Sequence, residues 1–116
     1  MTKMIVLVML AAAPFVLCFS AAADSGQSCP EPANLTILSK SSGSIAFDWS
    51  DCMGGCKQYL VTYYRQDDDF QSQVFTAERS EISFSGLPSG TYDFSFATDC
   101  DFTMGGWVVI EDVIFN

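Results

Sequence analysis

Apolar and polar residues alternate along most of the chain after residue 33, with the period of two that is typical of β-strands. The clearest case is residues 44–49, "SIAFDW", where Ile45, Phe47 and Trp49 fall on one face and small or acidic residues on the other. Similar patterns predict six further strands, at residues 34–38, 59–65, 73–77, 81–87, 91–100 and 107–115. No segment after residue 23 shows a helical apolar stripe of useful length.

The same alternation predicts which side chains point into a core. Besides the three residues of 44–49, the expected inward set is Leu35, Ile37, Tyr59, Val61, Tyr63, Ile82, Phe84, Tyr92, Phe94 and Phe96. In the last segment the alternation slips near Glu111 and Asp112, which a β-bulge would explain. Seven short strands separated by turn residues predict an all-β fold, a two-sheet antiparallel β-sandwich.

The first 23 residues have a different character. One early lysine is followed by an apolar run and by Ala21–Ala23, which together predict a secretory signal peptide at residues 1–23 and a single domain at residues 24–116. A membrane anchor is disfavoured by Pro14 and the small residues at the cleavage site, and a lipoprotein site at Cys18 by the preceding leucine. We therefore expect a secreted, extracellular protein, or a periplasmic or cell-surface one if the source is bacterial.

Charge and composition narrow the function classes. Residues 24–116 carry four bases and all 14 acids of the chain, a formal net charge of −10. Such a surface repels nucleic acid and anionic membranes and suits a cationic partner, calcium or simple solubility. The chain has no histidine, which removes histidine-based catalysis and metal ligation. We expect neither an enzyme nor a cofactor nor a second membrane-spanning segment.

The order of key residues resembles that of a fibronectin type III domain. A Pro-x-x-Leu motif is followed by a tryptophan, by Tyr-x-Val-x-Tyr-x-Arg and by Gly-Leu-Pro-x-Gly-Thr-Tyr. The matching residues are Pro32, Leu35, Trp49, Tyr59, Val61, Tyr63, Arg65, Leu87, Gly90, Thr91 and Tyr92. The resemblance implies a fibronectin type III or immunoglobulin-like sandwich, in which Leu87 closes one end and the Tyr92 hydroxyl bonds nearby backbone. The Arg-Gly-Asp sequence of integrin-binding members is absent, and fold alone does not supply a function.

Four cysteines follow the predicted signal peptide, namely Cys29, Cys52, Cys56 and Cys100. An even number in a small secreted domain predicts disulfides, with three pairings possible. In a sandwich of this type all four lie at one end. Cys52 and Cys56 can close around two glycines, and the resemblance implies that Cys29 pairs with Cys100. A four-cysteine zinc site is the alternative, although only Cys52 and Cys56 have zinc-ligand spacing. A redox site would need a Cys-x-x-Cys motif, which is absent.

Three further features are candidate sites. Met53, Phe102 and Met104 are apolar residues in predicted loops at the cysteine end, where they could contact a partner. Residues 67–69, three consecutive aspartates, are predicted to form a solvated turn at the opposite end, since three neighbours in line cannot all face one calcium ion. Asn34 begins a glycosylation sequon, but its expected position in a strand is unfavourable.

These observations leave three classes of function. The first is a monomeric, secreted, non-enzymatic module that binds a protein or glycan or mediates adhesion through disulfide-stapled loops. The alternative is a structural subunit of an extracellular assembly that associates through sheet edges, for which the apolar segment 107–115 could serve. An enzyme is the least favoured class.

Overall fold

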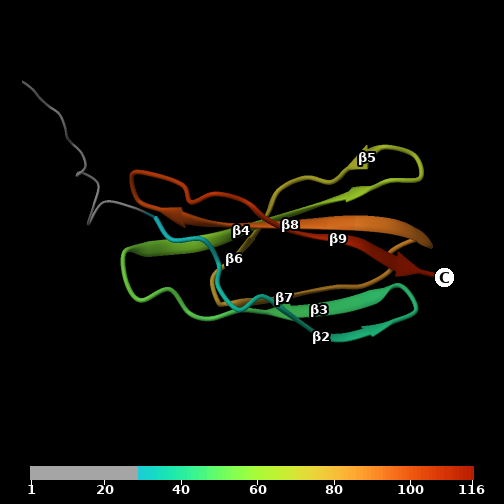
Figure 1. Ribbon diagram of the computed structural model, residues 1–116, viewed down its shortest axis with the longest axis horizontal. Coiled ribbons are helices and arrows are strands. Elements are labelled where there is room, and N and C mark those ends of the chain that lie inside the picture. Colours follow the sequence, from blue (N-terminus) through green and yellow to red (C-terminus); the bar gives the residue numbers. More distant parts are fainter. Residues whose placement is uncertain (1–28) are drawn as a thin grey trace, which may run out of the picture.

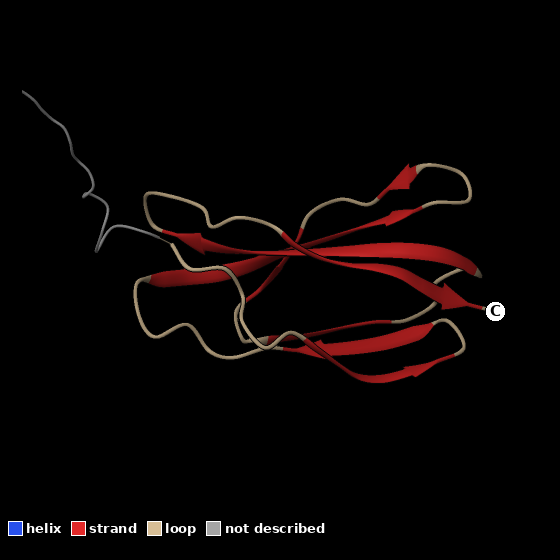
Figure 2. Cartoon of the chain, viewed as in Figure 1, coloured by secondary structure: helices blue, strands red, loops and turns tan. Residues whose placement is uncertain are grey.

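The computed structural model describes residues 29–116, so the predicted signal peptide lies outside the described residues. Strands joined by loops make up this part of the chain, without a helix (Figure 2). The eight strands are β2 (Thr36–Ser41), β3 (Ser44–Asp48), β4 (Cys56–Arg65), β5 (Phe70–Gln71), β6 (Phe75–Ala77), β7 (Glu81–Phe84), β8 (Gly90–Cys100) and β9 (Val108–Phe115). No helix in this range is long and apolar enough to cross a membrane.

The strands form two antiparallel sheets that pack face to face, as Figure 1 shows. One sheet has the order β2-β3-β7, and the other has the order β5-β4-β8-β9 with β6 also paired to β4. The predicted all-β sandwich is therefore confirmed. Residues 29–116 contain eight strands instead of the seven expected, because Phe70 and Gln71 pair with Arg65 and Tyr64 to form the two-residue strand β5.

Aromatic rings from both sheets fill the core. The ring of Phe47 in β3 lies 4.9 Å, centroid to centroid, from the rings of both Phe94 and Phe96 in β8. Trp49 meets Tyr59 nearly edge to face at 5.2 Å, a favoured geometry for aromatic pairs. The predicted inward residues that are buried are Ile45, Phe47, Trp49, Tyr59, Val61, Tyr92, Phe94 and Phe96, and those half-buried against them are Leu35, Tyr63, Ile82 and Phe84.

The expected inward position of Ile37 is wrong. Ile37 is 38% exposed, and every residue of β2 is exposed to solvent. The pattern failed there because β2 is the outermost strand of its sheet and its register with β3 shifts between Ile37 and Ser39. Alternation along an edge strand does not have to follow the core when few neighbours cover it. The strand also begins at Thr36, two residues later than expected.

The predicted bulge in the last strand is confirmed. Tyr92 pairs with Val113 and Phe94 pairs with Ile110, so two residues of β9 lie opposite Asp93 alone. One of them, Asp112, has a φ of 60°, in the left-handed region that a bulge residue can occupy. The shift lets apolar side chains on both sides of the Glu111–Asp112 step reach the core.

The turn before β8 is closed in the way that the fibronectin resemblance implied. The Tyr92 hydroxyl donates a hydrogen bond of 2.7 Å to the carbonyl oxygen of Pro88, and the Tyr92 side chain is fully buried. Leu87 is also buried, and its backbone N–H donates to the carbonyl of Gly43 in the turn between β2 and β3. A backbone hydrogen bond thus joins the turn before β8 to the turn between β2 and β3.

Candidate binding site

Two disulfides lie side by side at one end of the sandwich. Cys29 is bonded to Cys100 and Cys52 to Cys56, with Cα–Cα distances of 6.0 and 6.2 Å. Cys56 opens β4 and lies directly opposite Cys100, the last residue of β8. All four sulfurs therefore lie at the same end of the sandwich. Cys52 pairs with Cys56 across the two glycines, and Cys29 pairs with Cys100 as the resemblance implied. This arrangement favours the disulfide framework over the four-cysteine zinc site.

Hydrogen bonds pin the loop between β3 and β4 on both sides. The backbone N–H of Ser50 donates to the carbonyl of Ala33 at 2.8 Å, and the Asn34 amide donates to the Ser50 hydroxyl at 2.7 Å. Further along, the backbone N–H of Cys52 donates to the hydroxyl of the core residue Tyr59 at 3.0 Å. The loop is thus attached to the N-terminal segment and to the core.

The loop between β8 and β9 is held by its own backbone and by the N-terminal segment. Cys100 donates its backbone N–H to Thr103, and Gly105 donates to Thr98 at 2.8 Å. Gly105 is buried so closely against the chain that a Cβ atom there would lie 2.9 Å from the carbonyl oxygen of Pro30. A side chain at this position would force the loop away from the N-terminal segment.

The three apolar residues singled out in the sequence all lie on these loops and are exposed. The exposed fraction is 98% for Met53, 93% for Phe102 and 49% for Met104. Met104 also forms an isolated antiparallel β-bridge with Asp99. Figure 1 shows the two loops at the same end of the sandwich. We use the name stapled pole for this end of the molecule, made up of residues 29–33, 50–58 and 99–106.

A cleft of about 540 Å³ opens in the stapled pole between the N-terminal segment and the loop after β3. Pro30 and Pro32 contribute apolar surface to the lining, and Tyr59 also lines it. Glu31 and Asp51 bring one carboxylate each from the two segments. Its volume is in the range of sites that hold small molecules or peptide segments.

The cleft is not apparent from the sequence. Its main walls are residues 30–33 and 50–54, which are separated in sequence by two strands. Nothing in the sequence shows that these two segments face each other. The juxtaposition follows from the sandwich topology and from the hydrogen bond between Ser50 and Ala33.

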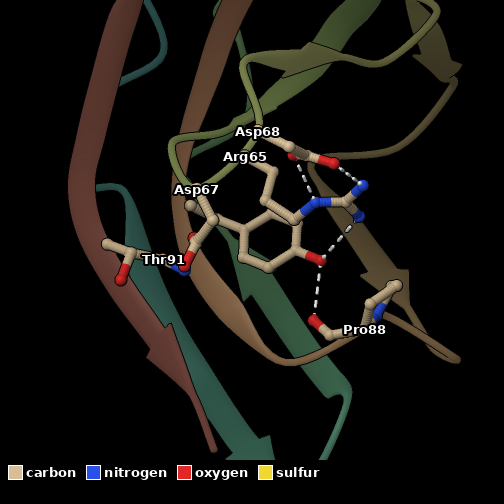
Figure 3. A network of polar contacts seen from close by, with 6 residues as sticks. Arg65, Asp67, Asp68, Pro88 and Thr91 are labelled. Atoms are coloured by element: carbon tan, nitrogen blue, oxygen red, sulfur yellow. Dashed lines mark hydrogen bonds and ion pairs between the residues drawn. The ribbon is translucent and has the colours of Figure 1, made fainter.

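At the opposite end, the three aspartates form an exposed turn, as expected, but two of them are also tied to neighbouring strands by hydrogen bonds. Asp67 accepts a hydrogen bond of 2.8 Å from the backbone N–H of Thr91 at the start of β8. Asp68 accepts two, from Nε and one terminal nitrogen of Arg65, at 2.8 and 2.7 Å (Figure 3). A terminal nitrogen of Arg65 also contacts the Tyr92 hydroxyl at 3.5 Å. The carboxylates brace this turn against β8.

The network shifts the pKa values of its members. The hydrogen bonds from Arg65 lower the pKa of the Asp68 carboxyl below its usual value, and the same contact raises the pKa of Arg65 further. Tyr64 donates its hydroxyl to Asp69, and this hydrogen bond raises the pKa of Tyr64. The ion pair with Arg65 offsets one negative charge of this turn.

Two other sequence-based expectations can be placed on the structure. Asn34 is exposed and precedes β2 instead of lying within it, so the expectation of an unfavourable strand position is wrong. Among residues 29–116, no group of three or more histidine, cysteine, aspartate or glutamate side chains is arranged to hold a metal ion.

Comparison with known proteins identifies the fold. No protein-family model and no curated protein sequence matches the chain. Solved structures do match. The fibronectin type III domain of human collagen α-1(XX) chain has a TM-score of 0.67 at 15% identity, covering 81% of this chain and 92% of the domain. A computationally redesigned β-sandwich protein has a TM-score of 0.64 at 14% identity, with coverage of 75% and 91%.

The kinase region of twitchin from C. elegans, which includes a fibronectin type III domain, also matches, with a TM-score of 0.64 at 14% identity. The match covers 76% of this chain and 17% of the twitchin chain. The protein thus has a fibronectin type III-like fold, as the sequence resemblance indicated. Its two disulfides and this fold are consistent with an extracellular location.

Proposed function

We propose that the protein is a secreted, non-enzymatic binding or adhesion module, and that a protein or glycan partner docks on the stapled pole. The observation that carries this proposal is that apolar side chains are exposed on loops that are firmly attached to the rest of the domain. Met53 and Phe102 are almost fully exposed, yet their loops are attached through disulfides, through Tyr59 and through the N-terminal segment. Loops ordered before binding lose less entropy on binding, which raises affinity.

The rest of the surface is less suited to recognition. The inward faces of both sheets are committed to the core, and the aspartates of the opposite end are bonded to β8 and Arg65. Isolated apolar residues on a protein surface are common and need no partner. Two apolar tips on neighbouring anchored loops beside a cleft are a more specific arrangement, and they support placing the partner there.

A capture experiment tests the proposed function. Biotinylated mature protein is the bait for extracellular proteins and glycoconjugates of the source organism, with quantitative mass spectrometry as the readout. The test bait carries Phe102→Ser and Met104→Ser. The control bait carries Val74→Ser and Ile114→Ser, which are 54% and 52% exposed and lie outside the stapled pole. We expect partners retained by wild type and control baits and lost from the test bait. Equal retention by all three would overturn the proposal.

Secretion is tested separately. If residues 1–23 are a signal peptide, the exported protein begins at Asp24 and contains two disulfides. Intact-mass and N-terminal analysis of protein recovered from the culture medium, periplasm or cell surface measures both. A retained N-terminus at Met1 in the cell would contradict this part of the proposal.

Assembly through a sheet edge is the second candidate, and one observation favours it. Val109 and Ile114 of β9 are 45% and 52% exposed, and Trp107, just before the strand, is 39% exposed. Within the described range β9 pairs only with β8. Two features oppose it. The bulge at Glu111–Asp112 interrupts the edge, and the ammonium group of Lys40 donates to the Ile114 carbonyl that a new strand would need.

The oligomeric state separates the two candidates. Light scattering coupled to size-exclusion chromatography, at high salt to screen the negative charge, gives the mass of the mature chain. We expect a monomer over the accessible concentration range. A dimer or polymer that dissociates when Val109→Lys is introduced would favour the assembly role.

A further inference from the structure

The cleft of the stapled pole has two walls that are joined to each other by a backbone hydrogen bond. One wall is the segment 30–33 and the other is the loop 50–54, and Tyr59 and Thr98 also line the space. Pro32 is buried, and the two walls are joined by the hydrogen bond from Ser50 to Ala33. Anchored backbone therefore forms both walls of the cleft.

The charges of the cleft have one sign. Glu31 and Asp51 line it, and no lysine or arginine does. The Asp51 carboxylate accepts a hydrogen bond from the Ser80 hydroxyl, and the Glu31 carboxylate lies beside Gly106, where a Cβ atom would be 2.8 Å away. Neither Ser80 nor Gly106 is among the residues that line the cleft. Within residues 29–116 neither acid forms an ion pair, the salt bridge there being Arg65 with Asp68. The base of the same loop, Lys57, lines an adjoining, smaller hollow that Asp51 also lines, and it does not line the cleft.

We infer that the cleft binds a basic segment of the partner, with an arginine or lysine side chain inserted between the two walls. The aliphatic part of such a side chain packs on Pro30, Pro32 and the Tyr59 ring, and its positive head lies near Glu31 and Asp51. An apolar cleft with two carboxylates repels an acidic segment and leaves the carboxylates poorly solvated if a neutral apolar one enters. Charge complementarity thus selects the occupant. This inference rests on the proposed function and names the partner chemistry that the same pole would recognise.

The test uses two short peptides as probes of the cleft. The first is acetyl-Leu-Arg-Leu-amide, and the second has citrulline in place of arginine, which keeps the shape and removes the charge. Titration into the ¹⁵N-labelled mature protein, followed by NMR chemical shifts, reports both affinity and location. We expect the arginine peptide to shift the amides of residues 31, 33 and 51–54. The citrulline peptide should bind about tenfold more weakly, as expected for the loss of charge-assisted hydrogen bonds.

Charge variants separate the cleft from general attraction to an acidic protein. Glu31→Gln with Asp51→Asn removes the two carboxylates of the cleft, while asparagine can still accept the Ser80 hydrogen bond. Glu81→Gln with Glu111→Gln removes the same charge from exposed positions outside the cleft. We expect about a tenfold loss of arginine-peptide affinity in the first variant and little change in the second. The NMR spectrum of each variant also shows that it is folded.

Several outcomes would overturn the inference, namely equal binding of both peptides, equal loss in both variants, shifts confined to residues outside the stapled pole, or no binding at millimolar peptide. The Phe102→Ser, Met104→Ser protein keeps the test separate from that of the proposed function. If this protein loses the captured partner while the cleft binds no arginine peptide, the stapled pole remains the docking surface and only the basic occupant of the cleft is refuted.

Discussion

Cys56 and Cys100 lie directly opposite each other where β4 and β8 meet the loops, yet each is bonded to a different partner. A bond between these two would have joined strands that the ladder already holds. Instead, Cys100 holds the N-terminal segment through Cys29, and Cys56 closes the loop after β3 through Cys52. The disulfides therefore add order to the segments that the sheets do not reach.

The two disulfides should differ in their effect on stability. The Cys29–Cys100 bond closes a sequence separation of 71 residues, whereas Cys52–Cys56 closes one of 4. On the chain-entropy account, their loss costs about 4 and about 2 kcal/mol, because a longer loop constrains the unfolded chain more. Urea unfolding of the double-serine variants at Cys29 and Cys100, and at Cys52 and Cys56, measures the difference.

Thiol titration of denatured, non-reduced wild-type mature protein is the control, and it should find no free thiol. Two or more reactive thiols per chain would mean that one of the bonds is absent. Equal midpoints and slopes for the two double-serine variants would contradict the loop-length argument.

The sequence predicted the sandwich because its core strands alternate strongly. Strands β3 and β8 carry aromatic or branched residues at every second position, so their inward faces could be assigned residue by residue. The slip at Glu111–Asp112 was visible for the same reason. Edge strands carry weaker information, because one side lacks neighbours. Ile37 was misplaced on that account.

The site was predicted only in part, since loops follow no periodic pattern. The exposed residues Met53 and Phe102 could be found as apolar residues between strands, but the cleft depends on segments brought together by the fold. The aspartates at 67–69 form the exposed turn that the sequence suggests. Their hydrogen bonds could not be foreseen, because the donors are supplied by the start of β8 and by Arg65.

Trp49→Ala should be strongly destabilising. The side chain is 5% exposed and packs against Tyr59 and Phe96, so truncation leaves a cavity and costs about 3–5 kcal/mol. Trp49→Phe should cost much less, because it keeps an aromatic ring and removes the indole N–H, which is buried without a hydrogen-bond partner. Urea midpoints of the two variants test this order. A midpoint for Trp49→Ala close to that of wild type would show that Trp49 is not in the core.

Tyr92→Phe removes the hydroxyl that closes the turn before β8 and that also has a longer contact with Arg65. The ring remains buried, but the Pro88 carbonyl loses its 2.7 Å partner, which should lower stability by about 1–2 kcal/mol. Tyr64→Phe is the matched control, because it removes a hydroxyl whose partner, Asp69, is exposed to water. Its effect should be smaller. Equal losses in thermal or urea unfolding would mean that the turn does not depend on the Tyr92 hydroxyl.

The contact between Arg65 and Asp68 should make stability depend on pH. The pKa of Asp68 is lowered in the folded protein, so its ionised form favours folding. This contribution is complete above the unfolded-state pKa, about 4, and is lost as pH falls through the lower folded-state value. The difference in urea midpoint between wild type and Asp68→Asn should therefore be constant at neutral pH and shrink below about pH 4. Added salt should reduce this difference in midpoint at neutral pH, because both groups are accessible to water.

Glu81→Gln is the control, since it removes one negative charge outside the network and corrects for the weaker self-repulsion of a less acidic protein. A difference that grows on acidification, or that Glu81→Gln reproduces, would show that the ion pair does not stabilise the fold.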